Sequence, residues 1–248
     1  MQFLTSLSIL AFLGAALASP IVGKRSWPDV VDNCNQDGTV ALTYDDGPWD
    51  YEEDVADALD GGKATFFFNG NNYECIYDRA DQIKALYDAG HTLGSHTWSH
   101  ADVTELSWDE FHDELWKVEE AFIKILGVKP KYFRPPYGNI NDNAMSVLEN
   151  RGYSKVFLWS DDTEDSLDKG AARGEEVLDG VANDYPNPHL VLSHSTYPQN
   201  SQEVLPHSVP KLKSAGYNLV TAGQCVGTDE WPYEWVGEPQ ARDDSWTC

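Results

Sequence analysis

Short apolar runs alternate along this chain with longer segments in which apolar residues recur every three or four positions. The short runs predict strands, and the periodic segments predict helices. Seven runs predict strands: residues 40–44, 64–68, 91–95, 131–134, 155–159, 189–193 and 217–221. Regular alternation of strand and helix predicts an α/β fold with a parallel sheet, either barrel-like or doubly wound. Seven units favour an incomplete barrel over the usual eight.

The clearest helix is predicted over residues 108–126. Ser107 and Glu110 have the spacing of a capping box, and Gly127 is a typical helix stop. The apolar residues of this helix fall on one face: Phe111, Leu115, Val118 and Phe122. Other helices are predicted to end at glycines: Gly61-Gly62, Gly90, Gly152 and Gly216.

Two adjacent carboxylates end the first predicted strand. Asp45 and Asp46 follow the apolar run, and Gly47-Pro48 prevents the strand from continuing. Neighbouring residues of an extended chain point to opposite sides, so one carboxylate can bind a metal while the other handles a proton. Taken alone, Asp-Gly-Pro is common in turns. The residues at the other strand ends therefore decide whether this motif is interpreted as a turn or as part of a functional site.

Two histidines follow the third predicted strand. His96 and His100 stand four residues apart, so a helical conformation there would put both imidazoles on one face, where they can share a cation. A histidine pair with this spacing is by itself more often structural. Together with Asp46 it makes a set of two histidines and one carboxylate, which leaves coordination positions open for water and substrate.

Three further strands end in polar groups. Arg134 opens Arg-Pro-Pro-Tyr-Gly, the stretch 159–165 is acidic, and Leu192-Ser-His194 closes the sixth strand. Each of these motifs also has a purely structural interpretation. Arg134 would be a salt-bridge partner, the acidic stretch a solvated loop, and His194 a histidine at the edge of the sheet. In parallel barrels, however, the active site forms where the carboxyl ends of the strands meet. The convergence of these groups on one rim therefore predicts an active site.

Composition limits the partners. The 248 residues, 41% of them hydrophobic, suit one large domain. A formal net charge of -24 disfavours nucleic acid and anionic membranes as partners, because a polyanion is repelled. An uncharged polymer or a small neutral substrate fits this charge better.

The first residues resemble a secretion signal. Residues 4–17 are apolar and Ala16-Leu17-Ala18 is a typical cleavage site, which predicts a signal peptide over residues 1–18. Lys24-Arg25 is typical of a processing site and ends a predicted pro-segment, residues 19–25. No later stretch is apolar enough to span a membrane, so we expect a secreted, extracellular protein.

Four cysteines in a secreted chain predict two disulfides, and three pairings are open. Cys34 precedes the first predicted strand and Cys225 follows the last, so a Cys34–Cys225 bond would tie the ends of the barrel together. Cys75 and Cys248 would then form the second bond.

Five ordered motifs carry a resemblance to a known family. They are Thr43-Tyr-Asp-Asp-Gly-Pro48, Ser95-His-Thr-Trp-Ser-His100, Arg134-Pro-Pro-Tyr137, the stretch 162–165 and Leu192-Ser-His194. The chain resembles the polysaccharide deacetylases with the NodB homology domain (carbohydrate esterase family 4), and most of all the secreted fungal chitin deacetylases. The resemblance implies a distorted (β/α)7 barrel as a single domain over residues 26–248, with a C-terminal tail, residues 226–248.

The resemblance also assigns roles to the matching residues. Asp46, His96 and His100 would hold a divalent metal, with Zn²⁺ as the expected ion and Co²⁺ as the alternative. Asp45 would be the general base, and Arg134 would keep Asp45 ionised and oriented.

On the leaving-group side, the resemblance makes His194 the general acid and Asp165 the residue that orients it. The backbone N–H of Tyr137 would stabilise the oxyanion. Tyr137, Leu192 and Trp159 would bind the substrate, with Leu192 lining the pocket for the acetyl methyl group. The implied substrate is chitin or a chitooligosaccharide, and the expected state is a monomer.

Two residues depart from the family pattern. Tyr44 stands where phenylalanine is usual. This substitution has a small effect if the ring packs beside the sheet and its hydroxyl finds a partner. Ser166 stands where many relatives have tryptophan, which removes an aromatic wall near the general acid. We expect a changed substrate preference before a loss of activity.

Other functions stay open. The same motifs serve peptidoglycan deacetylases and acetylxylan esterases, and a secreted chitin-binding protein without activity is a further alternative. Two histidines and a carboxylate also bind Fe(II) in oxygenases, but the alternation of strand and helix disfavours that fold class. The tail carries aromatic residues that would either extend a glycan groove or, as we expect, pack against the barrel: Trp231, Tyr233, Trp235 and Trp246.

Overall fold

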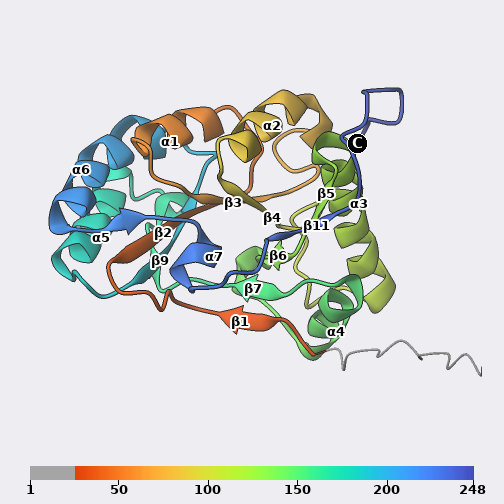
Figure 1. The fold of residues 1–248 in the computed structure, drawn as a ribbon, viewed down its shortest axis with the longest axis horizontal. Coiled ribbons are helices and arrows are strands. Elements are labelled where there is room, and N and C mark those ends of the chain that lie inside the picture. The colour runs from red at the N-terminus through yellow and green to blue at the C-terminus, as the bar shows by residue number, and fades with distance from the viewer. Residues whose placement is uncertain (1–25) are drawn as a thin grey trace, which may run out of the picture.

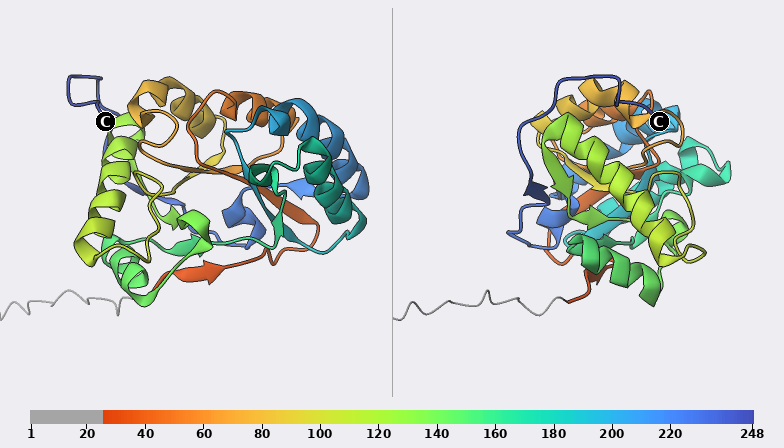
Figure 2. Two further views of the ribbon diagram at one scale, coloured as in Figure 1. Left: turned by 180° about the vertical axis from the view of Figure 1, so that it is seen from behind. Right: turned by 90° about the vertical axis from the view of Figure 1, so that its right-hand side faces the viewer.

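The computed structural model describes residues 26–248. Its main feature is a curled nine-stranded sheet with helices packed around the outer side (Figures 1 and 2). The strands of this sheet are β1 (Asp29–Val31), β2 (Thr39–Asp45), β3 (Thr65–Phe68), β4 (Thr92–Ser95), β6 (Tyr132–Phe133), β7 (Lys155–Phe157), β8 (Asp161–Asp162), β9 (His189–His194) and β10 (Asn218–Leu219). The helices are α1 (Glu52–Ala58), α2 (Ala80–Asp88), α3 (Trp108–Leu126), α4 (Asp142–Arg151), α5 (Ala171–Asn183), α6 (Leu205–Ala215) and α7 (Ala222–Cys225).

The sheet is a parallel barrel that stays open along one seam. Its strand order is β1-β7-β6-β4-β3-β2-β9-β8, β10 adds to β2, and all pairs are parallel. β7 and β8 follow each other in the chain but do not pair, because β1 occupies the edge of β7. The predicted α/β class and the incomplete barrel are therefore confirmed.

Each of the seven predicted runs overlaps a strand of this sheet, and the prediction missed four short strands. β1, β5 (Val128–Pro130), β8 and β11 (Tyr233–Trp235) have two or three residues each. Such short strands have too few positions to show an alternating pattern. β5 and β11 pair with each other in a separate antiparallel ribbon.

The predicted capping box and glycine stops are present. The Ser107 side chain accepts from the Glu110 backbone N–H, and the Glu110 carboxylate accepts from the Ser107 backbone N–H. Gly127 ends α3 in the left-handed conformation at φ 74°, which a residue with a Cβ adopts only with strain. Its ideal Cβ would also lie 2.0 Å from the carbonyl oxygen of Gly237, so this stop accommodates the C-terminal tail as well.

The core has an outer and an inner layer. The outer layer lies between the sheet and the helices and includes Leu42, Phe66, Phe68 and Phe122. The inner layer fills the barrel and is formed by Cys34, Ala41, Phe67, Tyr132, Phe157, Leu190, Ala222 and Cys225. The short helix α7 therefore plugs the end of the barrel at which the strands begin. The opposite end, where the strands finish, is left for polar groups.

Both predicted disulfides are present. Cys34 pairs with Cys225 at a Cα–Cα distance of 5.0 Å, and Cys75 pairs with Cys248 at 5.8 Å. The first bond fastens the plug to the start of the barrel, and the second fastens the C-terminus beside the loop after β3. The ring of Tyr44 stacks on Phe66 at a centroid distance of 5.5 Å, as expected for a tyrosine that packs beside the sheet.

The expectation that the aromatic tail packs on the barrel is half wrong. Tyr233 and Trp246 are buried, but Trp231 and Trp235 are 60% and 61% exposed. β11 is a three-residue strand at the edge of the fold, and only Tyr233 enters the core from it. Two tryptophan rings are therefore left facing solvent.

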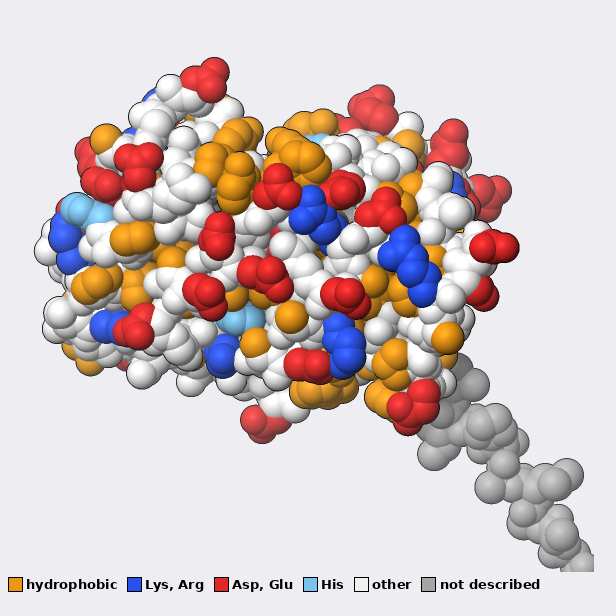
Figure 3. All heavy atoms as spheres, turned by 90° about the horizontal axis from the view of Figure 1, so that it is seen from above, with side chains coloured by type: hydrophobic (Ala, Val, Ile, Leu, Met, Phe, Trp, Pro, Cys, Tyr) orange, Lys and Arg blue, Asp and Glu red, His pale blue; other side chains and the backbone are white. Residues whose placement is uncertain are grey.

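The predicted signal peptide and pro-segment lie outside the described residues. Within residues 26–248, no helix combines the length and apolarity needed to cross a bilayer. Figure 3 shows carboxylate side chains spread over one face, with lysines and arginines between them. This surface agrees with the acidic composition.

The disulfide at the C-terminus yields a stability prediction. The double variant Cys75→Ala/Cys248→Ala opens a loop of 173 residues, and losing such a bond costs on the order of 2–4 kcal/mol of unfolding free energy. We expect a fall in the thermal midpoint of several degrees, measured by circular dichroism. The control is Thr247→Ala, which changes the neighbouring exposed residue and leaves the bond intact. An unchanged midpoint in the double variant would contradict this role.

Candidate active site

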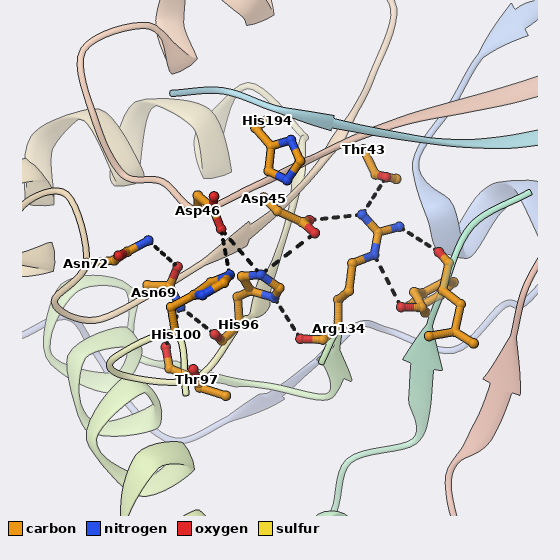
Figure 4. A network of polar contacts seen from close by, with 12 residues as sticks. Thr43, Asp45, Asp46, Asn69, Asn72, His96, Thr97, His100, Arg134 and His194 are labelled. Carbon is orange, nitrogen blue, oxygen red and sulfur yellow. Dashed lines mark hydrogen bonds and ion pairs between the residues drawn. The ribbon is translucent and has the colours of Figure 1, made fainter. Parts of the chain in front are cut away.

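The register of the parallel strands brings the motif residues to one rim of the barrel (Figure 4). Asp45 at the end of β2 pairs with His194 at the end of β9. Ser95 at the end of β4 pairs with Phe133, which places His96 beside Arg134. The sequence predicted this rim, because each of these residues ends an apolar strand.

Asp46, His96 and His100 form a group suited to a metal ion. One possible ligand atom from each lies within 4.8 Å of the others. Asp46 Oδ1 is 3.2 Å from His100 Nε2 and 3.5 Å from His96 Nε2. Ligand atoms of a tetrahedral ion at about 2.0–2.1 Å lie about 3.3–3.4 Å apart. Asp46 Oδ1 is buried and has no hydrogen-bond partner among the described residues, so the residues present fit a divalent metal.

Neighbouring groups fix the orientation of this set. His96 Nδ1 lies 2.8 Å from the backbone oxygen of Arg134, so Nδ1 carries the proton and the lone pair of Nε2 faces Asp46. The Asn69 side chain donates to the backbone oxygens of His96 and Thr97. Burial alone raises the pKa of Asp46, but the adjacent His100 and His96 imidazoles outweigh it and hold this pKa far below its usual range.

The two histidines converge without the helix that their spacing suggested. Residues 96–100 are irregular. Thr97 and His100 have φ values of 70° and 59°, and Asp46 and Tyr137 have 73° and 61°. Non-glycine residues rarely occupy this left-handed region, and such strain concentrates at functional sites. The imidazoles thus meet through tight turns, with ring centroids 5.1 Å apart.

Asp45 is held by Arg134, away from the metal group. Arg134 Nη1 is 2.9 Å from Asp45 Oδ1, and both side chains are buried, with Arg134 wholly inaccessible to solvent. Asp45 Oδ2 lies 3.8 Å from His96 Nε2, farther than Asp46 does. Burial lowers the pKa of Arg134 and Asp45 opposes that change. An arginine stays protonated under ordinary conditions, so Asp45 has a permanent cationic partner.

The other donors of Arg134 are also used. Nη1 donates to Thr43 Oγ1 at 2.7 Å, Nη2 to the backbone oxygen of Leu158 at 2.8 Å, and Nε to that of Phe157 at 3.2 Å. Phe157 ends β7 and Leu158 follows it. The guanidinium therefore satisfies two peptide oxygens at the end of this strand.

His194 forms a second proton-handling pair, with Asp165. His194 Nδ1 is 2.7 Å from Asp165 Oδ1, and the His194 backbone N–H donates to Oδ2 at 2.7 Å. Burial alone lowers the pKa of His194, but the hydrogen bond and charge of Asp165, with smaller contributions from Asp46 and Asp45, raise it to about 9. The imidazole is therefore a cation, and thus a proton donor, at neutral pH.

Two residues outside the motifs also support His194. The buried Asn200 begins a π-helical turn (Asn200–Val204), and its Nδ2 donates to Asp165 Oδ2 at 2.6 Å and to the His194 backbone oxygen at 2.8 Å. Tyr197 places its ring edge-on to His194, with centroids 6.0 Å apart. Ser166 is exposed, and Tyr197 supplies an aromatic contact to His194. No sequence motif marked either residue.

A buried carboxylate fixes the turn after Asp46. The Glu52 side chain accepts from the Trp49 backbone N–H and, at 2.8 Å, from Ser195 Oγ. Burial raises the pKa of Glu52. A Cβ on Gly47 would lie 2.3 Å from Glu52 Oε1, so this turn requires glycine. The sequence analysis missed Glu52, because a glutamate at the start of a helix is common.

The residues assigned to substrate binding lie around this rim. Tyr137 is exposed, and its ring meets His100 edge-on at 4.8 Å. Trp159 packs on the same loop, since a Cβ on Gly138 would lie 2.9 Å from its ring. Leu192 is buried in β9, two residues before His194. The structure therefore brings all the predicted site residues into one region.

Comparison with known sequences identifies the family. Residues 32–156 match the profile of the family described as polysaccharide deacetylase. A chitin deacetylase from Colletotrichum lindemuthianum is 35% identical over 240 residues, which cover 91% of this chain and 94% of that protein. A chitin deacetylase from Pestalotiopsis sp is 35% identical over 221 residues, 86% of this chain and 73% of that protein.

Solved structures agree with this match. The chitin deacetylase structure from Colletotrichum lindemuthianum aligns with a TM-score of 0.77 at 33% identity, over 84% of this chain and 96% of that chain. The Bc1960 peptidoglycan N-acetylglucosamine deacetylase structure aligns with a TM-score of 0.72 at 30% identity, over 82% and 94%. Shared sequence and fold together show that this chain belongs to the polysaccharide deacetylase family.

Proposed function

We propose that this protein is a secreted, metal-dependent chitin deacetylase that hydrolyses the acetamide of N-acetylglucosamine units, releasing acetate. One observation carries the proposal. A group of two histidines and one aspartate lies beside two buried proton-handling pairs of opposite kind, Asp45 with Arg134 and His194 with Asp165. Amide hydrolysis needs both a base for water and an acid for the leaving amine.

Asp46, His96 and His100 are the residues that would hold the metal. A divalent ion bound there would supply a Lewis acid that polarises the amide carbonyl and makes water more acidic. Nitrogen and carboxylate ligands in this number suit Zn²⁺, and Co²⁺ accepts the same set. The protonated Nδ1 of His96 fixes the tautomer that such coordination requires.

Asp45 is the proposed general base. Its pairing with Arg134 through Oδ1 holds the carboxylate in place, and Oδ2 is left to accept a proton from the attacking water. The Arg134 guanidinium also aims the carboxylate, because it is itself fixed by Thr43 and the end of β7. Removing a general base of this kind typically lowers the rate by about 10²- to 10⁴-fold.

His194 is the proposed general acid. An amine leaves an amide readily only when its nitrogen is protonated, and the imidazolium of His194 supplies that proton at neutral pH. Asp165 and Asn200 fix the ring position. The backbone N–H of Tyr137, held by a turn with two preceding prolines, would donate to the developing oxyanion, which is worth on the order of 3 kcal/mol.

The substrate assignment rests on the relatives and on charge. Relatives that are 35% identical over most of the chain are chitin deacetylases. Chitin is uncharged and is compatible with a chain of net charge -24. The two disulfides fit an oxidising, extracellular setting, where this polymer occurs. Leu192 and Trp159 would contact the acetyl group and its sugar ring.

A second candidate is a peptidoglycan substrate. A peptidoglycan-N-acetylglucosamine deacetylase from Bacillus cereus is 34% identical over 188 residues, 73% of this chain and 66% of that protein. The reacting group is the same acetamide, so the same residues would act on it.

Acetate release tests the function directly. We expect the purified chain to release acetate from N-acetylglucosamine oligomers, to lose this activity on dialysis against a chelator, and to regain it with Zn²⁺ or Co²⁺. Peptidoglycan and acetylated xylan are the control substrates. Release from xylan alone would make the protein an esterase, and no release from any substrate by the metal-loaded chain would contradict the proposal.

The His194–Asp165 pair predicts a pH dependence. The raised pKa keeps His194 protonated below about pH 9. Activity is therefore expected to fall as the pH rises through that region, which gives the alkaline limb of the pH–activity profile. A bound metal cation lowers the pKa of His194 and moves this limb to lower pH. Asp165→Asn removes the main interaction that raises the pKa of His194. The alkaline limb should therefore shift further toward acid pH, and kcat should fall. The matched control is Asp168→Asn, an exposed carboxylate in the same loop. Equal pH profiles for Asp165→Asn and the unchanged chain would exclude His194 as the acid.

A further inference from the structure

A cavity lies at the end of the barrel opposite to the candidate active site. Its volume is about 290 Å³, room for on the order of ten water molecules. It lies where α2 ends and β4 and β6 begin, and it is covered by α7 and the segment leading into β11. In Figure 1, α7 and β11 lie in front of the sheet. No residue assigned above to catalysis or to the metal lines this cavity.

Aromatic rings form much of its wall. Tyr87 and Tyr233 meet edge-on with centroids 5.3 Å apart, and Trp231 meets Tyr233 at 5.5 Å. Tyr233 is fixed, because its Oη accepts from the Leu93 backbone N–H at 2.7 Å. Trp231 contacts this fixed wall but is itself 60% exposed. A large exposed aromatic ring beside a cavity is typical of a binding surface.

Polar groups also line the wall. His91 is 5% exposed, and its Nδ1 accepts from the Ala64 backbone N–H at 3.1 Å, so the neutral ring carries its proton on Nε2. Burial and Lys63 lower the pKa of His91 to about 4. Within the described residues, the buried Oη of Tyr132 has no hydrogen-bond partner. Such a group costs free energy when it stays unpaired.

We propose that this cavity is a second, non-catalytic binding site for N-acetylglucosamine oligosaccharides, with one sugar ring in the cavity and Trp231 stacked on the next. The proposal rests on the proposed function for the identity of the sugar. Neutral hydrogen-bond donors in the wall match the hydroxyl and N-acetyl groups of a pyranose, and the aromatic rings match its apolar faces.

Other kinds of ligand fit this cavity less well. A hydrocarbon would leave the Oη of Tyr132 unpaired. An anion would face Glu230, which lines the wall, and the strongly acidic chain around it. Glu230 is already paired with Lys131, which disfavours a cation. The volume admits about one sugar ring, so a longer chain would extend out past Trp231.

A sugar site at this end of the barrel would act by holding the enzyme on its polymer. Because the cavity and the active site open at opposite ends, one soluble oligomer does not reach both. On solid chitin, neighbouring chains are available to both sites, and attachment at one raises the effective concentration at the other. The cavity should therefore matter for insoluble chitin and not for short soluble oligomers.

The test uses Trp231→Ala in the full chain, with Trp235→Ala as the matched control. Trp235 is equally exposed and lies on the same segment, but it does not line the cavity. We expect Trp231→Ala to weaken retention on insoluble chitin by roughly three- to tenfold, as expected for the loss of one aromatic contact. Activity on insoluble chitin should fall with it, while acetate release from the soluble tetramer stays unchanged.

A second variant keeps the test independent of Trp231. Thr228→Trp places a large ring at the cavity wall and should weaken retention in the same way. Retention of both variants equal to that of Trp235→Ala would overturn the proposal, as would an equal loss on soluble and insoluble substrates. Retention is measured without turnover, so failure of the cavity proposal is distinguishable from failure of the deacetylase assignment.

Discussion

The buried ion pair between Arg134 and Asp45 is the interaction on which the rest of the site depends. A guanidinium with no solvent contact is costly unless each of its nitrogens is hydrogen-bonded, and removing one partner of such a pair typically costs about 3–5 kcal/mol. Arg134 meets this condition through Asp45, Thr43 and two backbone oxygens at the end of β7. Its own backbone oxygen accepts from His96 Nδ1. One residue thus orients the proposed base, one proposed metal ligand and the open seam of the barrel.

Buried polar side chains stabilise the backbone both at the end of β7 and in the strained turns. β7 and β8 do not pair, and two backbone oxygens at the end of β7 accept from the Arg134 guanidinium. The left-handed turns at Asp46, Thr97 and His100 are each unfavourable. Buried polar side chains stabilise them: Glu52 braces the turn after Asp46, and Asn69 binds the peptide oxygens around Thr97. A preorganised site of this kind loses little free energy to rearrangement during catalysis.

Much of this architecture was predictable from sequence, because buried parallel strands are apolar and the active site lies where they end. Asp45, Asp46, His96, Arg134 and His194 each end an apolar strand or follow it within two residues, so their convergence followed from strand order alone. The disulfide pairing followed similarly from the positions of the cysteines relative to the strands. These predictions needed only local patterns and one general rule about parallel sheets.

Other features depend on tertiary packing that a local pattern does not encode. The turn between His96 and His100 is irregular where the spacing suggested a helix, because the left-handed residues Thr97 and His100 set its course. Asn200 supports the His194–Asp165 pair from a π-helical turn that no short motif marks. The short strands β1, β8 and β11 are defined by their pairing with β7, β9 and β5, which are distant in the sequence. The exposure of Trp231 and Trp235 likewise depends on where β11 leaves the core.

The central claim is that two adjacent aspartates have separate tasks, Asp46 on the metal and Asp45 on the proton. The most direct measurement compares Asp45→Asn and Asp46→Asn for bound Zn²⁺, by atomic spectroscopy after gel filtration, and for acetate release in the same preparations. The account predicts that Asp45→Asn keeps about one metal per chain and loses activity by on the order of 10²-fold or more, whereas Asp46→Asn loses the metal and the activity together. Full metal occupancy in Asp46→Asn, or near-normal activity in Asp45→Asn, would contradict it.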